Sequence, residues 1–143
     1  MEIERKYLIK DMPNTDDYDR KHITQGYLCT SPVVRVREDG YKYYLTYKGK
    51  GLLAREEANL SLTEDAFRHL IAKADGRIIM KTRYLIPYEK YMIELDVFEG
   101  EHAPLVMAEV EFASIEEAEK FIAPSWFGEE VTDNPSYQNS NMI

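Results

Sequence analysis

Charged residues recur in pairs two positions apart, and most pairs carry one sign. The basic pairs include Arg-x-Arg at 35–37 and Lys-x-Arg at 81–83, and the acidic pairs include Glu-x-Glu at 2–4 and 109–111. Guanidinium and ammonium groups held side by side are suited to phosphate oxygens. Paired carboxylates supply the hard oxygen ligands that Mg²⁺ and Mn²⁺ prefer. These residue types therefore predict a site for a polyanion and a divalent cation.

The two-residue spacing indicates β-strands, because residues two apart share one strand face. The opposite faces are apolar, as where Val34 and Val36 flank Arg35. In a half-exposed sheet the charged face would simply meet water. The sorting of charge by strand favours a binding site instead, since a solvated face usually mixes signs.

Periodicity predicts strands and two helices. The strands are expected at about residues 1–10, 22–29, 32–38, 41–48, 54–62, 77–88, 91–98 and 105–113. The sharpest hairpin signal between them is Asp39-Gly40. Helices are expected from Thr63 and from Ser114, which are both candidate N-caps. From Pro124 onward we expect a closing segment over the barrel.

Both helices have one apolar stripe, which the apolar outer face of a closed barrel would cover. The charged faces would then point inward, and eight strands leave room for one small ligand. We therefore expect a mainly β (α+β) fold. It would be an eight-stranded antiparallel β-barrel tunnel with at least two helices packed outside, formed as a single domain by residues 1–143. A membrane barrel is disfavoured by the short strands and covering helices.

The net charge of -8 and pI near 4.9 argue against nucleic-acid or anionic-membrane partners but leave room for a local basic pocket. No apolar run approaches the roughly 18 residues of a membrane span, and charges at Glu2 to Lys6 do not fit a signal peptide. We expect a cytoplasmic protein. Cys29 is expected to be a buried structural thiol. A homodimer is left open.

The opening residues Glu2-Ile3-Glu4-Arg5-Lys6 resemble the ExExK signature of the CYTH superfamily, the triphosphate tunnel metalloenzymes. Further segments are similar to this family in order and spacing. They are Gln25–Leu28, Arg35–Arg37, Leu45–Gly49, Lys81–Tyr84, Glu94–Phe98, Ala108–Glu111, Trp126–Gly128 and Glu130–Thr132. The chain looks most like prokaryotic inorganic tripolyphosphatases. It departs from the family pattern at Asn59, where an acid is frequent.

The resemblance implies metal-dependent hydrolysis of inorganic tripolyphosphate to pyrophosphate and orthophosphate. The small-molecule triphosphate would lie in a basic tunnel, and a divalent cofactor, Mg²⁺ or Mn²⁺, would activate water. The phosphate chain is assigned to Lys6, Arg35, Arg37, Lys48, Arg55, Lys81 and Arg83. The metal is assigned to Glu2, Glu4, Asp96, Glu109 and Glu111, of which Glu4, Asp96 and Glu109 are also named as catalytic.

Several roles stay open within this assignment. Asp96 and Glu109 are expected at a second metal or at the attacking water, while Glu57 and Glu94 are either ligands or supporting partners. Tyr137 and Asn139 resemble a tail motif of the family and are not assigned to ligand contact.

Alternative functions on the same fold are a nucleoside or thiamine triphosphatase and an adenylate cyclase, in which a ribose hydroxyl attacks the α-phosphate. A non-catalytic triphosphate-binding module would gain nothing from clustered carboxylates. A barrel filled only by internal salt bridges would bury charge at high desolvation cost. Because no aromatic-plus-amide arrangement for a nucleobase is evident, tripolyphosphate is expected to be cleaved more efficiently than ATP.

Overall fold

The computed structural model describes residues 1–143 and is built mainly of β-strands. The strands are β1 (Glu2–Ile9), β2 (Asp19–Thr30), β3 (Val33–Asp39), β4 (Lys42–Lys48), β5 (Ala54–Arg55), β6 (Glu57–Leu62), β7 (Asp75–Tyr88), β8 (Tyr91–Phe98), β9 (Val106–Glu111) and β10 (Phe127–Glu130). The helices are α1 (Glu64–Ile71) and α2 (Ile115–Lys120), with 3₁₀ helices η1 (Gly100–His102), η2 (Pro135–Tyr137) and η3 (Asn139–Asn141). The predicted strands and helices are all present. The fifth predicted strand is divided at Glu56 into β5 and β6, and β10 is an addition.

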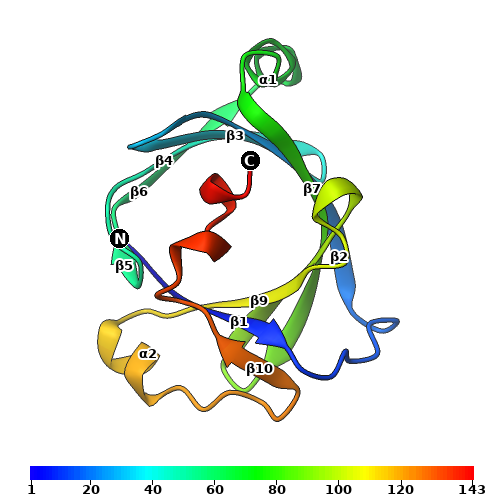
Figure 1. Ribbon diagram of the computed structural model, residues 1–143, viewed down its shortest axis with the longest axis vertical. Coiled ribbons are helices and arrows are strands. Elements are labelled where there is room, and N and C mark those ends of the chain that lie inside the picture. Colours follow the sequence, from blue (N-terminus) through cyan, green and yellow to red (C-terminus); the bar gives the residue numbers. More distant parts are fainter.

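The strands form one antiparallel sheet that curls into a nearly closed ring (Figure 1). Their order is β10-β1-β9-β8-β7-β2-β3-β4-β6. The ring closes because β5, which continues into β6, pairs back to the start of β1 with Glu2 opposite Arg55. β10 pairs with the other end of β1, with Tyr7 opposite Glu130. The predicted mainly β barrel with helices outside is confirmed.

The largest hydrophobic core lies outside the ring, between the barrel wall and the segment that carries α2 and β10. Ser114 caps α2 by accepting a hydrogen bond from the backbone N–H of Glu117. Just after this helix, the Phe121 ring packs edge-on against Phe112 of the chain that follows β9. Each such apolar side chain contributes roughly 1.5–3 kcal/mol when fully buried. Burial outside the barrel fixes the strand faces, so the alternate residues must point inward.

Helix α1 covers a second part of the outer wall, at the top of Figure 1. Thr63 caps it by accepting from the N–H of Ala66, and the fully buried Phe67 packs on Tyr43 of β4. Gly26 of β2 allows the end of the helical segment to approach, because a Cβ there would lie 2.8 Å from that of Ala74. The β2 side chains on either side of Gly26 are therefore held facing the interior.

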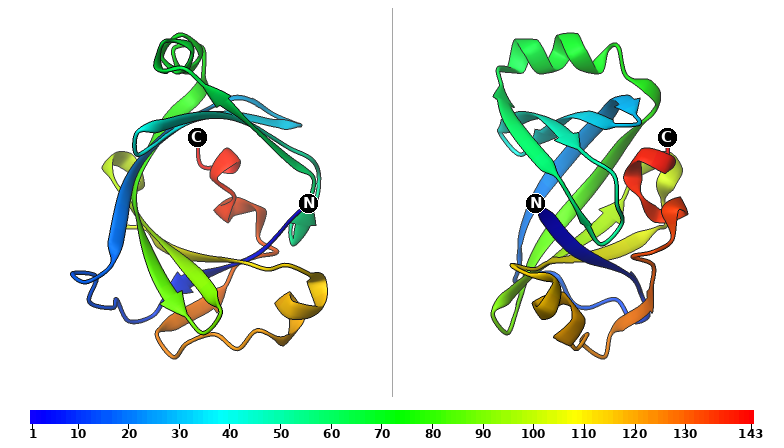
Figure 2. Two further views of the ribbon diagram at one scale, coloured as in Figure 1. Left: turned by 180° about the vertical axis from the view of Figure 1, so that it is seen from behind. Right: turned by 90° about the vertical axis from the view of Figure 1, so that its left-hand side faces the viewer.

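The interior of the barrel has an apolar end as well as a charged one. Ile79, Phe98 and Met107 each share a strand face with a charged residue two positions away, yet they form an apolar cluster with Tyr27 and Val33. The C-terminal residues pack on this cluster, and Figures 1 and 2 show them inside the ring in one view and at one of its ends in the other. The predicted closing role therefore applies to the last residues, whereas β10 lies outside the barrel.

The expectation that Cys29 is buried is wrong: it is exposed, near the end of β2. The pairing of β2 with β3 shifts register between Tyr27 and Cys29, which breaks the alternation on which the expectation rested. No helix is both long and apolar enough to cross a membrane.

Candidate active site inside the barrel

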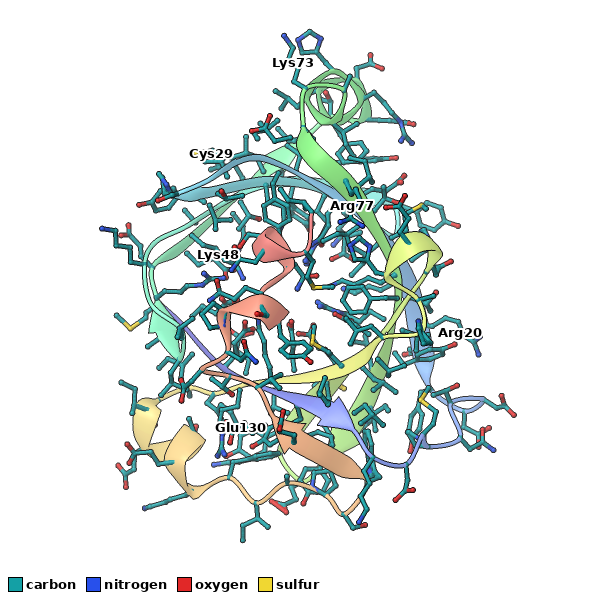
Figure 3. All side chains as sticks on the ribbon, in the orientation of Figure 1. Arg20, Cys29, Lys48, Lys73, Arg77 and Glu130 are labelled. Carbon is teal, nitrogen blue, oxygen red and sulfur yellow. The ribbon has the colours of Figure 1, made fainter.

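A cavity of about 370 Å³ occupies the charged half of the barrel interior, and we call it the chamber. All of the predicted site residues except Lys81 and Asp96 line it. Figure 3 shows side chains filling the ring, with Lys48 pointing inward, whereas Lys73 and Glu130 lie outside. The alternation of the strands thus places the sorted charges of at least six strands around one space.

Arg35 and Arg37 of β3 are basic residues of the chamber that have no carboxylate partner. Arg35 donates from Nη2 to Thr46 Oγ1 at 3.2 Å, and its Nε is buried with no hydrogen-bond partner. Arg37 donates from Nε to Gln25 Oε1 at 2.8 Å. The pKa of Arg37 is lowered to about 10, mainly by burial and in part by the neighbouring guanidiniums of Arg35 and Arg83. Two adjacent cations without a counter-charge make this wall a place for an anion.

The other basic residues on the chamber wall are neutralised by acids. Lys48 Nζ lies 2.9 Å from Glu2 Oε1, and Arg55 Nε lies 3.7 Å from the same oxygen. Lys6 Nζ stands between Glu4 at 3.6 Å and Glu109 at 4.0 Å. These acids come from β1 and β9, across the ring from β3. The chamber therefore has a cationic wall facing a wall of paired charges.

Asp96 and Lys81 come together behind the chamber wall and are both fully buried. Asp96 accepts from Arg83 Nε at 2.7 Å and Arg83 Nη2 at 2.8 Å, and Lys81 Nζ lies 2.7 Å from its Oδ2. Although burial alone would raise it, the pKa of Asp96 is lowered by Arg83 and Lys81. Burial lowers the pKa of Lys81 to about 8. Asp96 is fully buried and does not line the chamber, so direct contact with metal or water is not what this geometry favours.

The acids near the start of β1 repel one another. Burial raises the pKa of Glu2 to about 8, assisted by hydrogen-bonding contact with the Glu57 carboxyl and by the charge of Glu4. Glu57 Oε2 is buried, and Lys48 Nζ lies 3.6 Å from it. Burial also raises the pKa of Glu111, and the carboxylates of Glu57 and Glu4 add to the effect. Such a group needs a proton or a cation among its oxygens.

This donor set fits a hard divalent cation, which takes carboxylate oxygens. No three acidic, histidine or cysteine side chains already converge as a complete ligand set. The reason lies in the ion pairs, because Lys6 and Lys48 occupy carboxylates that a cation would share. A cation would therefore bind together with a movement of these ammonium groups away from the acids.

Neutral side chains of the chamber were not assigned to the site from the sequence. Thr46 Oγ1 accepts from Arg35 and donates to Asn59 Oδ1 at 2.6 Å, and Asn59 Nδ2 donates to Glu57 Oε1 at 2.7 Å. Their position was readable, since each lies two residues from a charged residue on the same face. Asn139 also lines the chamber, and the fully buried Gln25 accepts a hydrogen bond from Arg37 of the chamber wall. Asn139 had no such signal, because it comes from the C-terminal segment and not from a strand.

Comparison with known proteins places these features in one family. The CYTH domain matches residues 1–140. An inorganic triphosphatase of Nitrosomonas europaea is 41% identical over 146 residues, which cover 99% of this chain and 95% of the relative. An inorganic triphosphatase of Acetivibrio thermocellus is 34% identical, with 99% and 92% covered.

Solved structures show the same arrangement. The crystal structure of the inorganic triphosphatase NE1496 superposes with a TM-score of 0.73 at 36% identity, covering 99% of this chain and 93% of that one. The PH1012 protein of Pyrococcus horikoshii gives a TM-score of 0.62 at 20% identity, with 84% of each chain covered. At 20% identity, the similarity to the PH1012 protein shows a shared fold and nothing about function.

Proposed function

Because this chain belongs to the CYTH domain family, we propose that it is an inorganic triphosphatase, a hydrolase that converts tripolyphosphate into pyrophosphate and orthophosphate. Relatives that carry the name inorganic triphosphatase match almost the whole chain. The observation that carries the proposal is the unpaired Arg35 and Arg37 on one side of the chamber, opposite the clustered carboxylates. A polyanion and a cation together would satisfy both walls.

Arg35 and Arg37 bind the phosphate chain in this proposal. Their guanidinium groups are already fixed by Thr46 and Gln25, so substrate binding does not require them to be ordered first. The Arg35 Nε that lacks a partner gains a phosphate oxygen as acceptor. Phosphoanhydride hydrolysis depends mostly on positioning and on neutralising charge, which fixed donors provide.

Glu2, Glu4, Glu109 and Glu111 would hold the divalent cation, with Glu57 supporting them from β6. When bound, Mg²⁺ or Mn²⁺ supplies charge neutralisation of the phosphates and a lower pKa for a coordinated water. Lys6 and Lys48 would then be free to turn from their carboxylate partners toward the phosphate chain. In this proposal, the ion pairs of Lys6 and Lys48 with carboxylates exist before the cation and the substrate bind. Binding would replace these carboxylate contacts with contacts to phosphate.

Lys81 and Asp96 support the site without lining it. Asp96 fixes the guanidinium of Arg83, whose Nη1 also reaches Glu94 at 3.1 Å. Arg83 lines the chamber and lies 3.5 Å from Glu109. It thus presents a fixed cation between the acids and the substrate.

The chamber favours inorganic tripolyphosphate over nucleotides. Tyr27, Val33 and Tyr44 are its only hydrophobic lining residues, and the rest are polar or charged. An uncharged nucleoside half would displace solvated charge without an apolar surface to receive it. A chain made of phosphates can use donors from several strands at once.

A substrate panel tests the proposal. Tripolyphosphate, ATP, GTP and thiamine triphosphate are incubated with the protein and Mg²⁺ or Mn²⁺, and orthophosphate, pyrophosphate and cyclic AMP are measured. The expected result is the highest kcat/KM for tripolyphosphate. A higher kcat/KM for ATP or thiamine triphosphate would show that tripolyphosphate is not the preferred substrate. Formation of cyclic AMP with pyrophosphate would show that the reaction is cyclisation and not hydrolysis.

A further inference from the structure

The C-terminal segment contributes Asn139 and Ser140 to the lining of the chamber. Asn139 begins η3 and is 8% exposed, yet it lines the cavity together with residues from the barrel strands. Its Oδ1 accepts from Lys81 Nζ at 3.2 Å and from Gln25 Nε2 at 3.5 Å. Its Nδ2 forms no hydrogen bond within the protein, in contrast with its oxygen.

The orientation of this amide is determined by its neighbours. Lys81 can only donate, so Asn139 must turn its oxygen toward the ammonium group. Gln25 is fixed in the same way, because Arg37 Nε can only donate and therefore takes Gln25 Oε1. Gln25 Nε2 then faces Asn139 and Tyr27 as a donor. The hydrogen bonds of the two amides are therefore consistent with one orientation of each side chain. In this orientation the Asn139 NH₂ group is left for the chamber, which Asn139 lines.

The segment that carries Asn139 is anchored at several points. The His102 ring nitrogen Nε2 lies 2.6 Å from the carbonyl oxygen of Met142. Ile143 packs on Gly76, where an added Cβ would meet it at 3.0 Å, and Asn141 Nδ2 donates to the carbonyl of Pro135 at 2.7 Å. Asn139 is therefore held in place before any ligand arrives, as a binding donor should be.

We propose that Asn139 is a substrate-binding residue, whose Nδ2 donates to a phosphate oxygen of the triphosphate. This inference rests on the proposed function. It makes the C-terminal segment part of the site, through a neutral donor beside the cationic wall of Arg35 and Arg37. A donor of this kind binds an anionic oxygen, and a carboxylate in its place would face the phosphates with a like charge.

Asn139→Asp and Asn141→Asp form a matched pair for the test. Both variants make the same chemical change on η3 and add the same charge, but Asn141 is exposed on the outside of the segment. Asn141→Asp also removes a hydrogen bond of the segment, so it controls for local loosening. Thermal unfolding of each variant is recorded first, to compare folded proteins.

The kinetic readout is the separation of KM from kcat for tripolyphosphate. Asn139→Asp is expected to raise KM by about tenfold or more, the effect of losing a hydrogen bond to a charged group and gaining repulsion. Asn139→Ala, which removes the donor without adding charge, is expected to raise KM by a smaller factor. Asn141→Asp should stay within about twofold of the wild-type KM. Unchanged KM in both Asn139 variants, or an equal rise in Asn141→Asp, would overturn the inference.

Calorimetric titration of inorganic tripolyphosphate in the presence of chelator gives a second readout that does not depend on turnover. Weaker binding by Asn139→Asp than by Asn141→Asp supports the inference, and equal affinities contradict it. The two proposals fail in different ways. A wild-type protein that binds tripolyphosphate without hydrolysing it refutes the proposed function. In that case, the affinities of Asn139→Asp and Asn141→Asp for tripolyphosphate still test whether Asn139 binds the phosphate chain.

Discussion

Arg83 holds both carboxylate oxygens of Asp96, through Nε at 2.7 Å and Nη2 at 2.8 Å, and Lys81 reaches the same group. The cluster is buried beside the chamber, with Asp96 and Lys81 fully inaccessible to solvent. A fork-shaped pair of this kind fixes direction as well as charge. Asp96 therefore acts on the chamber through Arg83.

Asp96→Asn tests this relationship. The variant keeps the shape of the side chain but leaves Lys81 and Arg83 as two buried cations without their shared counter-charge. The free energy of unfolding, measured by urea denaturation, is expected to fall by about 3–5 kcal/mol. Asp39→Asn is the control, because Asp39 pairs with the partly exposed Lys21 and should cost about 1 kcal/mol or less. Equal losses in the two variants would contradict a special role for the buried pair.

Arg35→Ala tests the cationic wall. Arg35 has no carboxylate to compensate, so its removal should not destabilise the fold and should weaken substrate binding. We expect KM to rise by about tenfold or more for tripolyphosphate and by a smaller factor for ATP, because the first substrate carries the greater charge. Arg20→Ala, on the outer side of the barrel, is the control (Figure 3). Wild-type KM values in Arg35→Ala would remove this residue from the phosphate site.

The pH dependence of stability tests the carboxyl cluster without any assay of turnover. Glu2 has a pKa of about 8 in the folded protein against an ordinary value of 4.5, so the folded state binds a proton that the unfolded state releases between these values. Stability should therefore be lost as the pH rises through this window. Between pH 6 and 8 the melting temperature in chelator should fall, and the fall should be smaller in Glu2→Gln.

The measurement should stay below about pH 8, because above that pH the titration of Lys81 changes stability in the opposite direction. Its pKa of about 8 lies below the ordinary value of 10.5, so stability from this group rises with pH between those values. Added Mg²⁺ should restore the melting temperature of the wild type at pH 8, since a cation replaces the proton. The same decline in Glu2→Gln as in the wild type would show that another group is responsible.

Glu4→Gln tests an acid of the first strand. Glu4 is buried in the chamber and lies 3.6 Å from Lys6, and the amide keeps its size while removing the charge. The melting temperature should change little, and kcat should fall by at least about tenfold, as expected when a cation ligand or its support is lost. Glu129→Gln, on the exposed face of β10, should behave as the wild type. Equal turnover in both variants would place Glu4 outside the site.

The barrel could be predicted because its signal is local. Apolar and charged residues alternate along β3, β8 and β9, which indicates that one face of each strand packs on an apolar core and the other lines a charged interior. β10 gave no such signal, since Phe127 and Glu130 belong to four residues that are held by pairing with β1. Sequence periodicity also did not show where the interior becomes apolar, because Ile79 continues the face of Lys81 and Arg83.

The residue types that form the site could be predicted from the sequence, but the contacts between these residues could be predicted less well. Alternation placed the charged residues inside, but whether Asp96 meets a cation or Arg83 depends on the register of β7 and β8, where Arg83 lies directly opposite Asp96. Asn139 enters from a segment without periodicity, so only the three-dimensional arrangement brings it to the chamber. The spacing of Thr46 from Lys48 indicates that it faces the interior, but its contact with Arg35 is seen only in the structure.

Phosphate release from inorganic tripolyphosphate, followed with and without a divalent cation, tests directly whether this chain is a metal-dependent triphosphatase. We expect orthophosphate and pyrophosphate in equal amounts with Mg²⁺ or Mn²⁺, no release after chelation, and full recovery when the cation is added back. Release that persists at the same rate in metal-free buffer would contradict the role given to Glu2, Glu4, Glu109 and Glu111. A wild-type protein that releases no phosphate with either cation would contradict the triphosphatase itself.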